Sequence, residues 1–128
     1  MLVLSKLNKT ICVMKLVDSN HTNLLKTALD AYALRQKAIA SNVANIDTPG
    51  YKRLEVPFES QLQKAQNSGS GGVDLSKIQP SLQETEEMPL IENEMMALAD
   101  TQIRAQLVTR SLRHNFQLLK AGITGRNQ

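Results

Sequence analysis

The chain has little aromatic bulk. Among its 128 residues there are no Trp, two Tyr and two Phe, although hydrophobic residues make up 41%. Its apolar surface is therefore mainly aliphatic, and an aliphatic side chain buries less area than an aromatic ring. A chain of this length has room for one domain with one modest core. The shortage of aromatic rings argues against a self-sufficient globule.

The sequence also lacks the residue clusters that enzymes and metal proteins need. A single cysteine, Cys12, excludes an internal disulfide, and no Cys/His group has metal-ligand spacing. His21 and His114 lie far apart, each beside an asparagine, as is typical of solvated helix surfaces. The glycines within 69–72 lack a following Gly-Lys-Ser/Thr, and the carboxylates within 84–87 suit a solvated loop. We therefore predict no catalytic residue, no metal, no cofactor and no small-molecule substrate; the protein is not expected to be an enzyme.

Charge gives a weak indication of partners. The formal net charge is +3, from 15 basic and 12 acidic residues spread along the chain. A nucleic-acid binder usually gathers its basic residues on one face or in one run. We therefore expect no nucleic-acid partner.

The N-terminal residues faintly resemble a signal sequence. Lys6 and Lys9 interrupt the apolar run, and no small-residue cleavage site follows, so neither a secretory signal nor a membrane span is predicted. A start at Met14 would leave residues 1–13 as an upstream extension. If the protein leaves the cytoplasm, another route must take it.

A long helix is predicted near the N-terminus. Residues 22–47 contain no Gly or Pro, and side chains recur at alternating steps of four and three. This is the heptad spacing of helices that pack along a seam. The seam consists of Leu25, Leu29, Tyr32, Gln36, Ile39, Val43 and Ile46.

A second long helix is predicted over residues 92–121, with Asn93 as its N-cap and Gly122 and Gly125 at its stop. Basic residues gather toward its end, as the helix dipole favours: Arg110, Arg113 and Lys120. The predicted seam consists of Met95, Leu98, Gln102, Ala105, Thr109, Leu112, Phe116 and Leu119. A flanking stripe consists of Met96, Ala99, Ile103 and Leu107.

The middle of the chain opposes any long regular element. Residues 53–91 hold three of the four prolines and a Ser/Gly-rich run, which favour loops. Alternation allows a short β-hairpin there, formed by Leu54, Val56 and Phe58 with Val73, Leu75 and Ile78. The predicted fold class is mainly α, an antiparallel coiled-coil-like hairpin of two long terminal helices with a loop-rich middle.

Two long helices joined by a loose middle leave apolar stripes uncovered. Ordering the backbone opposes folding by about 1–2 kcal/mol per residue, which one helical seam offsets poorly. We therefore favour a chain that completes its burial against copies or relatives of itself. The alternative is a monomeric bundle in which the middle folds back over the stripes.

The stretch SNVANIDTPGYK at 41–52 predicts how the first helix ends. Thr48-Pro49-Gly50 suits a tight turn, since Pro fixes φ and Gly accepts positive φ. Asn42 and Asn45 lie on one face of the last turns, where their amides can bond freed carbonyls or the returning chain. We expect the helix to end near residue 47 and the ring of Tyr51 to pack against its end.

This same stretch resembles the signature of the bacterial flagellar basal-body rod and hook proteins. Those proteins carry an Ala-Asn-x-x-Thr-x-Gly-Tyr/Phe-Lys pattern after their N-terminal helix. The distal stretches MMALADTQIRAQLVTRSL at 95–112 and LLKAGITGR at 118–126 are most similar to the proximal rod (FlgB) family. The residues that match the pattern are Ala44, Asn45, Thr48, Gly50, Tyr51 and Lys52. The predicted motif turn consists of Ala44, Asn45, Thr48, Pro49, Gly50 and Tyr51.

The resemblance implies a structural subunit of the proximal rod, a hollow drive shaft crossing the periplasm that assembles through terminal helices and serves motility. Implied partners are copies of itself, other rod proteins, the rod-to-membrane-ring adaptor and the flagellar type III export apparatus. Export would need no cleaved signal peptide, and Phe58 with Leu62 fits a Phe-x-x-x-hydrophobic recognition pattern. Ordinary packing explains Phe58 equally well. A soluble adaptor or chaperone of the export pathway is the alternative function.

These inferences divide the chain into an N-terminal extension (1–15), a first helix with its turn (16–52), an irregular middle (53–91) and a second helix with its tail (92–128). The residues predicted to carry packing and assembly are Leu25, Leu29, Tyr32, Ile39, Val43, Leu98, Ile103, Leu112, Phe116 and Leu119.

Overall fold

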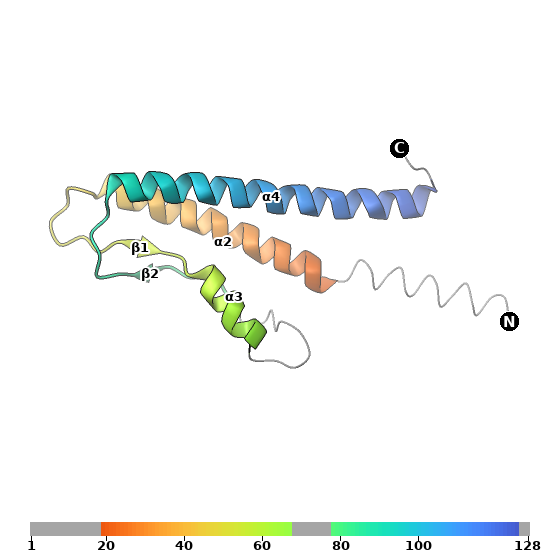
Figure 1. The fold of residues 1–128 in the computed structure, drawn as a ribbon, viewed down its shortest axis with the longest axis horizontal. Coiled ribbons are helices and arrows are strands. Elements are labelled where there is room, and N and C mark those ends of the chain that lie inside the picture. Colours follow the sequence, from red (N-terminus) through yellow and green to blue (C-terminus); the bar gives the residue numbers. More distant parts are fainter. Residues whose placement is uncertain (1–18, 68–77, 126–128) are drawn as a thin grey trace.

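The structure, a computed structural model, describes residues 19–67 and 78–125. In chain order the elements are α2 (Ser19–Ala44), β1 (Leu54–Glu55), α3 (Phe58–Asn67), β2 (Gln83–Glu84) and α4 (Ile91–Thr124). The two long helices α2 and α4 lie side by side and run in opposite directions (Figure 1). The predicted mainly helical, antiparallel hairpin is confirmed.

The ends of α4 differ from those predicted. The N-cap is Leu90, in extended conformation with no side-chain cap, so the prediction of Asn93 is wrong. Glu92 and Glu94 lie in the first turn, where the helix dipole favours carboxylates, whereas the last turn holds no basic residue. Gly125 ends the helix with φ 63° and donates its N–H to a carbonyl of the preceding turn at 2.9 Å.

Small side chains of α2 contribute to the core. Three alanines of α2 are buried, Ala28, Ala31 and Ala38, and Ala105 and Val108 of α4 pack against the same cluster. Beside them the rings of Tyr32 and Phe58 meet edge to face at 6.1 Å between centroids, joining α2 to α3. Among the described residues, the other buried hydrophobic side chains are Leu25, Ile39, Val56 and Ile78.

The buried face of α4 agrees with the predicted seam at half of the positions and lies one residue earlier at the other half. The predicted Leu98, Ala105, Leu112 and Leu119 do turn inward and are half-buried. Between them the inward positions are taken by Glu94, Thr101, Val108 and Asn115 instead of Met95, Gln102, Thr109 and Phe116. Phe116 is 57% exposed, so its predicted burial is wrong within a single chain.

The other predicted packing residues lie mostly on the inner faces. Leu25, Tyr32 and Ile39 are buried, and Leu29 and Val43 are half-buried. Ile103 is 59% exposed. Whether these residues also serve assembly stays a prediction.

The middle segment contains a sheet and a helix. The strands β1 and β2 pair antiparallel, Leu54 with Glu84 and Glu55 with Gln83. The predicted partner strand is wrong at Ile78, which is buried but lies in no strand, and its other members, Val73 and Leu75, fall outside the described residues.

The ten-residue helix α3 replaces part of the predicted irregular middle. It contains no Gly or Pro, and Pro57 precedes it, which suits a helix start. Phe58, Leu62 and Ala65 recur at helical spacing and face the core. The Ser/Gly-rich run that follows α3 directly obscures this short helical pattern in the sequence.

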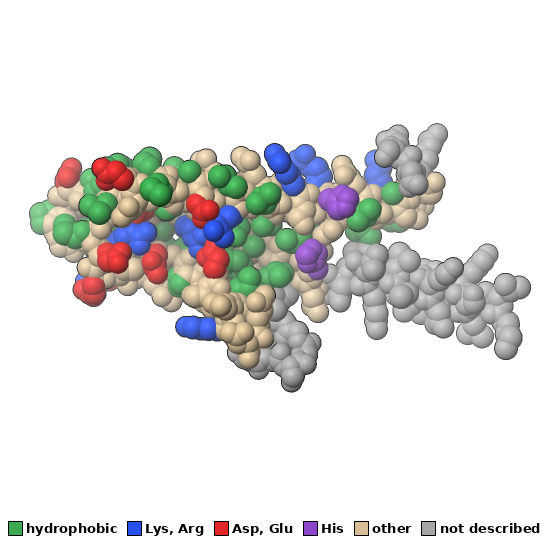
Figure 2. Space-filling view, viewed as in Figure 1, with side chains coloured by type: hydrophobic (Ala, Val, Ile, Leu, Met, Phe, Trp, Pro, Cys, Tyr) green, Lys and Arg blue, Asp and Glu red, His purple; other side chains and the backbone are tan. Residues whose placement is uncertain are grey.

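A further apolar surface lies on the outside of α4. Met96, Ile103 and Leu107 are exposed by 72%, 59% and 59%. Figure 2 shows hydrophobic side chains spread along the upper helix, interleaved with charged ones. Among the residues that the structure describes, no helix has both the length and the apolar character for a membrane crossing.

Candidate functional site

The candidate site is the turn after α2 together with the start of α4. After Ala44 the chain makes hydrogen-bonded turns, in which Thr48 N–H donates to the Asn45 carbonyl at 2.9 Å. Tyr51 N–H then donates to the Thr48 carbonyl at 3.2 Å, across Pro49 and Gly50. Gly50 has φ 75°, the positive value that a type II turn requires at its third residue. The predicted turn is confirmed, and α2 ends three residues earlier than expected.

The side chain of Asn42 organises this site. It is fully buried, and its amide makes four hydrogen bonds, which satisfy both N–H donors and both acceptor positions. Two are with the Leu54 backbone, whose N–H donates to Oδ1 and whose carbonyl accepts from Nδ2, both at 2.8 Å. The other two join Nδ2 to Glu94 at 3.0 Å and the Tyr51 hydroxyl to Oδ1 at 3.1 Å.

The amide of Asn42 therefore acts as a neighbouring strand would. On one edge of β1, Arg53 N–H donates to Glu87 at 3.3 Å, and the Arg53 carbonyl accepts from Thr85 at 2.8 Å. On the other edge, Leu54 pairs with the amide of Asn42. The returning chain is thereby fixed between β2 and α2.

Glu94 connects Asn42 and the returning chain to α4. Its side chain is fully buried and accepts a hydrogen bond from Arg53 Nε at 2.6 Å as well as the one from Asn42. The hydrogen bond to Glu94 holds the pKa of Arg53 above its ordinary value, although partial burial opposes this shift. A buried carboxylate needs such partners, because removing one leaves an uncompensated charge. The ion pair therefore ties the position of α4 to that of the returning chain.

Asn45, Ser41 and Tyr51 complete the end of α2. Asn45 Nδ2 donates to the Ser41 carbonyl at 2.9 Å, and Thr48 Oγ1 donates to Asn45 Oδ1 at 3.3 Å. The hydroxyls of Tyr51 and Ser41 lie 3.0 Å apart. The predicted bonding of Asn42 to the returning chain is confirmed. The Ser41 carbonyl that Asn45 bonds is not a freed one, because it also accepts the backbone N–H of Asn45 at 3.1 Å.

A second polar cluster lies further along α2, around Arg35. Arg35 donates to both carboxylate oxygens of Glu59, the Nη1 bond being 2.9 Å, and its Nη2 donates to the Val56 carbonyl at 2.8 Å. Its guanidinium also lies 5.7 Å from the ring centroid of Tyr32. Arg104 of α4 approaches Glu59 at 3.8 Å. This cluster joins α2, α3 and α4.

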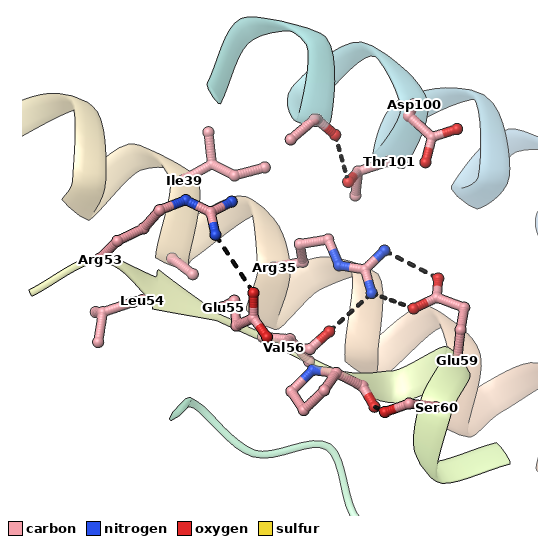
Figure 3. A pocket seen from close by; sticks show the side chains of 13 residues that line it. Arg35, Ile39, Arg53, Leu54, Glu55, Val56, Glu59, Ser60, Asp100 and Thr101 are labelled. Carbon is pink, nitrogen blue, oxygen red and sulfur yellow. Dashed lines mark hydrogen bonds and ion pairs between the residues drawn. The ribbon is translucent and has the colours of Figure 1, made fainter. Parts of the chain in front are cut away.

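Between the two clusters is a hollow of about 420 Å³. Figure 3 shows Arg35 and Arg53 projecting toward it, each bonded to a carboxylate. Glu55 pairs with Arg53, and Glu59 pairs with Arg35. In the described parts of the chain, no group of three or more His, Cys, Asp or Glu residues could hold a metal ion. What the arrangement does chemically is fix the relative positions of its elements.

The sequence pattern identifies only part of this site. It predicts the turn residues and Asn45, and it marks Asn42 as a bonding amide but not as the buried centre. The partners it misses are Arg35, Arg53, Glu59 and Glu94. The clue to Glu94 is its spacing of four and seven residues from Leu98 and Thr101 on the buried face, which the apolar Met95 obscures.

The predicted export pair lies in the core. Phe58 is 2% exposed against Tyr32, and Leu62 packs on the same cluster. Ordinary packing accounts for both side chains in the folded chain.

Comparison with known proteins identifies the family to which the chain belongs. Residues 23–52 match the family described as "Flagella basal body rod protein". The chain is 31% identical over 117 residues to the flagellar basal body rod protein FlgB of Bacillus subtilis, covering 79% of this chain and 91% of that protein. It is 57% identical over 37 residues to FlgB of Borreliella burgdorferi, a match covering 29% of this chain and 27% of that protein. For FlgB of Salmonella typhimurium the identity is 44% over 52 residues, 38% of each chain.

Proposed function

Because this chain belongs to the FlgB family of flagellar basal body rod proteins, we propose that it is a structural subunit of the basal-body rod. The observation that carries the proposal is the match to the Bacillus protein over 91% of that protein's length. The fold supports it, since the buried Asn42 and Glu94 bond α2, the returning chain and α4 to one another.

The finer proposal is that copies pack through α2 and α4 into the wall of the proximal rod, which transmits torque as part of the drive shaft. A subunit of a shaft must hold its helices at a fixed relative position under load. The buried bonds of Asn42 and Glu94 support this role, because a fully satisfied polar network specifies one arrangement. The exposed apolar side chains of α4 provide surface for neighbours.

We further propose that the protein is made in the cytoplasm, passes through the flagellar type III export apparatus without a cleaved signal peptide, and reaches the periplasmic rod. Its other partners would be the neighbouring rod proteins and the rod-to-membrane-ring adaptor. If Phe58 and Leu62 serve in export, recognition must precede folding, since Phe58 is buried in the folded chain.

Purification of basal bodies tests this function. In a strain whose only copy of the gene encodes an epitope-tagged chain, the tag should co-purify with detergent-extracted basal bodies, and deletion of the gene should abolish both rod and swimming. A chain that stays in the cytoplasmic fraction while complete rods form would support an export adaptor instead and refute the proposal.

A further inference from the structure

We propose that the outer face of α4 in one copy packs antiparallel against the outer face of α2 in the next copy. This inference rests on the proposed function and specifies the contact between copies. The outer seam of α2 consists of Lys26, Asp30, Ala33, Lys37, Ala40 and Ala44. The outer seam of α4 consists of Met96, Asp100, Ile103, Leu107, Arg110 and His114.

Both seams are exposed at every position, and each lies largely opposite the buried face of its helix. Asp100 lies nearer the hollow, which it also lines, and it pairs with Arg104 of its own helix at 2.6 Å. Residues two apart on a helix differ by about 200° in direction. Ala40 and Ala44 each lie two residues from the buried Asn42, as Ile103 does from the buried Thr101. The seams therefore lie on opposite edges of the α2–α4 pair. A copy that uses both edges contacts two neighbours.

The two seams have the same spacing. Each advances by steps of four, three, four, three and four residues, the pattern along which two helices pack continuously. This series reads the same in both directions, so antiparallel helices remain in register along all six positions.

Side-chain size is complementary in the antiparallel register. Met96 falls opposite Ala44, and Leu107 falls opposite Ala33. Met96 is 72% exposed and Leu107 is 59% exposed in the single chain. The small side chains of Ala33 and Ala44 leave room for these two side chains. Ile103 falls opposite Lys37, whose aliphatic stem can cover it while the ammonium stays in water.

Charge is complementary in the same register. Arg110 falls opposite Asp30, and neither makes an ion pair with another described residue. Asp100 lies one layer from Lys37. A parallel alignment would instead place Asp100 opposite Asp30, and like charges directly opposed are unfavourable.

The antiparallel contact also preserves polarity. Within one chain α2 and α4 already run in opposite directions, so an antiparallel α2–α4 contact leaves all copies pointing the same way. Because different surfaces meet, the contact does not close on itself and can propagate around a ring or along a helix. A symmetric α4–α4 pair would also place Ile103 against Leu107, but it would close after two copies.

Mixing of two variants distinguishes these arrangements. Ala40→Glu disrupts the outer seam of α2, and Ile103→Glu disrupts that of α4; each should weaken self-association of the full-length chain roughly tenfold or more in sedimentation velocity. Mixed together, they should form a one-to-one complex and nothing larger, because each retains the seam that the other lacks. Gln102→Glu adds the same charge at an exposed position about 100° from the seam and should associate like the unaltered chain. Circular dichroism confirms that each variant is folded.

If Ala40→Glu associates normally while Ile103→Glu does not, the copies pair through α4 alone and the proposal is wrong. It is also wrong if the mixture stays monomeric or if the unaltered chain does not self-associate at any accessible concentration. Basal-body purification separates this failure from that of the function: a tagged chain present in rods, with Ala40→Glu incorporated equally well, would refute the seam pairing alone.

Discussion

Replacing Asn42 with Ala should disconnect α2 from the returning chain and from α4. The substitution removes four hydrogen bonds of 2.8 to 3.1 Å at a fully buried position. Two partners keep other bonds, since the Tyr51 hydroxyl retains Ser41 and Glu94 retains Arg53. The Leu54 N–H, the Leu54 carbonyl and the Glu94 oxygen that faced Asn42 lose this partner.

An unsatisfied buried polar group destabilises a protein by about 1–3 kcal/mol. Three such groups would give a loss of about 3–9 kcal/mol. The loss is at the lower end here, because Leu54 is only half-buried and water can reach its N–H and carbonyl. We expect a loss of about 3 kcal/mol, a large part of the roughly 5–15 kcal/mol by which domains are stable. With an m-value of about 2 kcal/mol per molar urea, the urea concentration at the unfolding midpoint should fall by about 1.5 M.

The assay is urea unfolding of the full-length chain, followed by circular dichroism at low protein concentration. Asn45→Ala is the matched control: it removes the same amide from a half-buried position, where the amide bonds Ser41 in the last turn of α2 and Thr48. The free energy of unfolding of this control variant should fall by about 1 kcal/mol or less. If Asn42→Ala is destabilised no more than Asn45→Ala, the buried amide of Asn42 does not hold the returning chain and α4 in place, and the prediction is wrong.

Two further predictions concern the turn and the second cluster. Gly50 has φ 75°, and nothing lies within 4 Å of the place that a Cβ would take. Gly50→Val should therefore lower the free energy of unfolding by about 1–2 kcal/mol through backbone strain alone, and it should block assembly and swimming. An unchanged urea midpoint or normal motility would contradict this prediction. Partial burial raises the pKa of Glu59, but hydrogen bonds from Arg35 and from its own backbone, with the charges of Arg35 and Arg104, outweigh it and leave the pKa below its ordinary 4.5. A lowered folded-state pKa stabilises the protein above about pH 4.5, and this contribution is lost as pH falls through the folded value. Thermal unfolding at pH 7 and at stepwise lower pH should show this loss, and Glu59→Gln should make the profile flatter below pH 4.5; an identical profile would contradict it.

The helices and the turn could be predicted because their signals are local. Heptad spacing, the absence of Gly and Pro, and the sequence Thr48-Pro49-Gly50 act within one or two turns of chain. The C-terminal stop at Gly125 belongs to the same class. Such signals do not depend on which distant segment is packed against them.

The bonding partners from distant parts of the chain could not be predicted, because their positions depend on which segments pack together. Glu94 and Thr101 are buried, although the sequence pattern assigns burial to apolar residues beside them. Glu94 can be buried because Asn42 and Arg53 bond its carboxylate. Thr101 can be buried because its hydroxyl bonds a carbonyl of its own helix at 2.7 Å. The burial of Glu94 depends on bonds that span 41 and 52 residues. A polar residue at such a position is recognised only once its partner is placed.

Amide hydrogen exchange at Leu54 tests the central claim most directly, namely that the Asn42 side chain holds the returning chain as a strand neighbour would. The Leu54 N–H should be protected to a degree comparable with the amides of the α2 core, and Asn42→Ala should abolish that protection while the middle of α2 keeps its own. Exchange of Leu54 in the unaltered chain at the rate of a freely solvated amide would contradict the account.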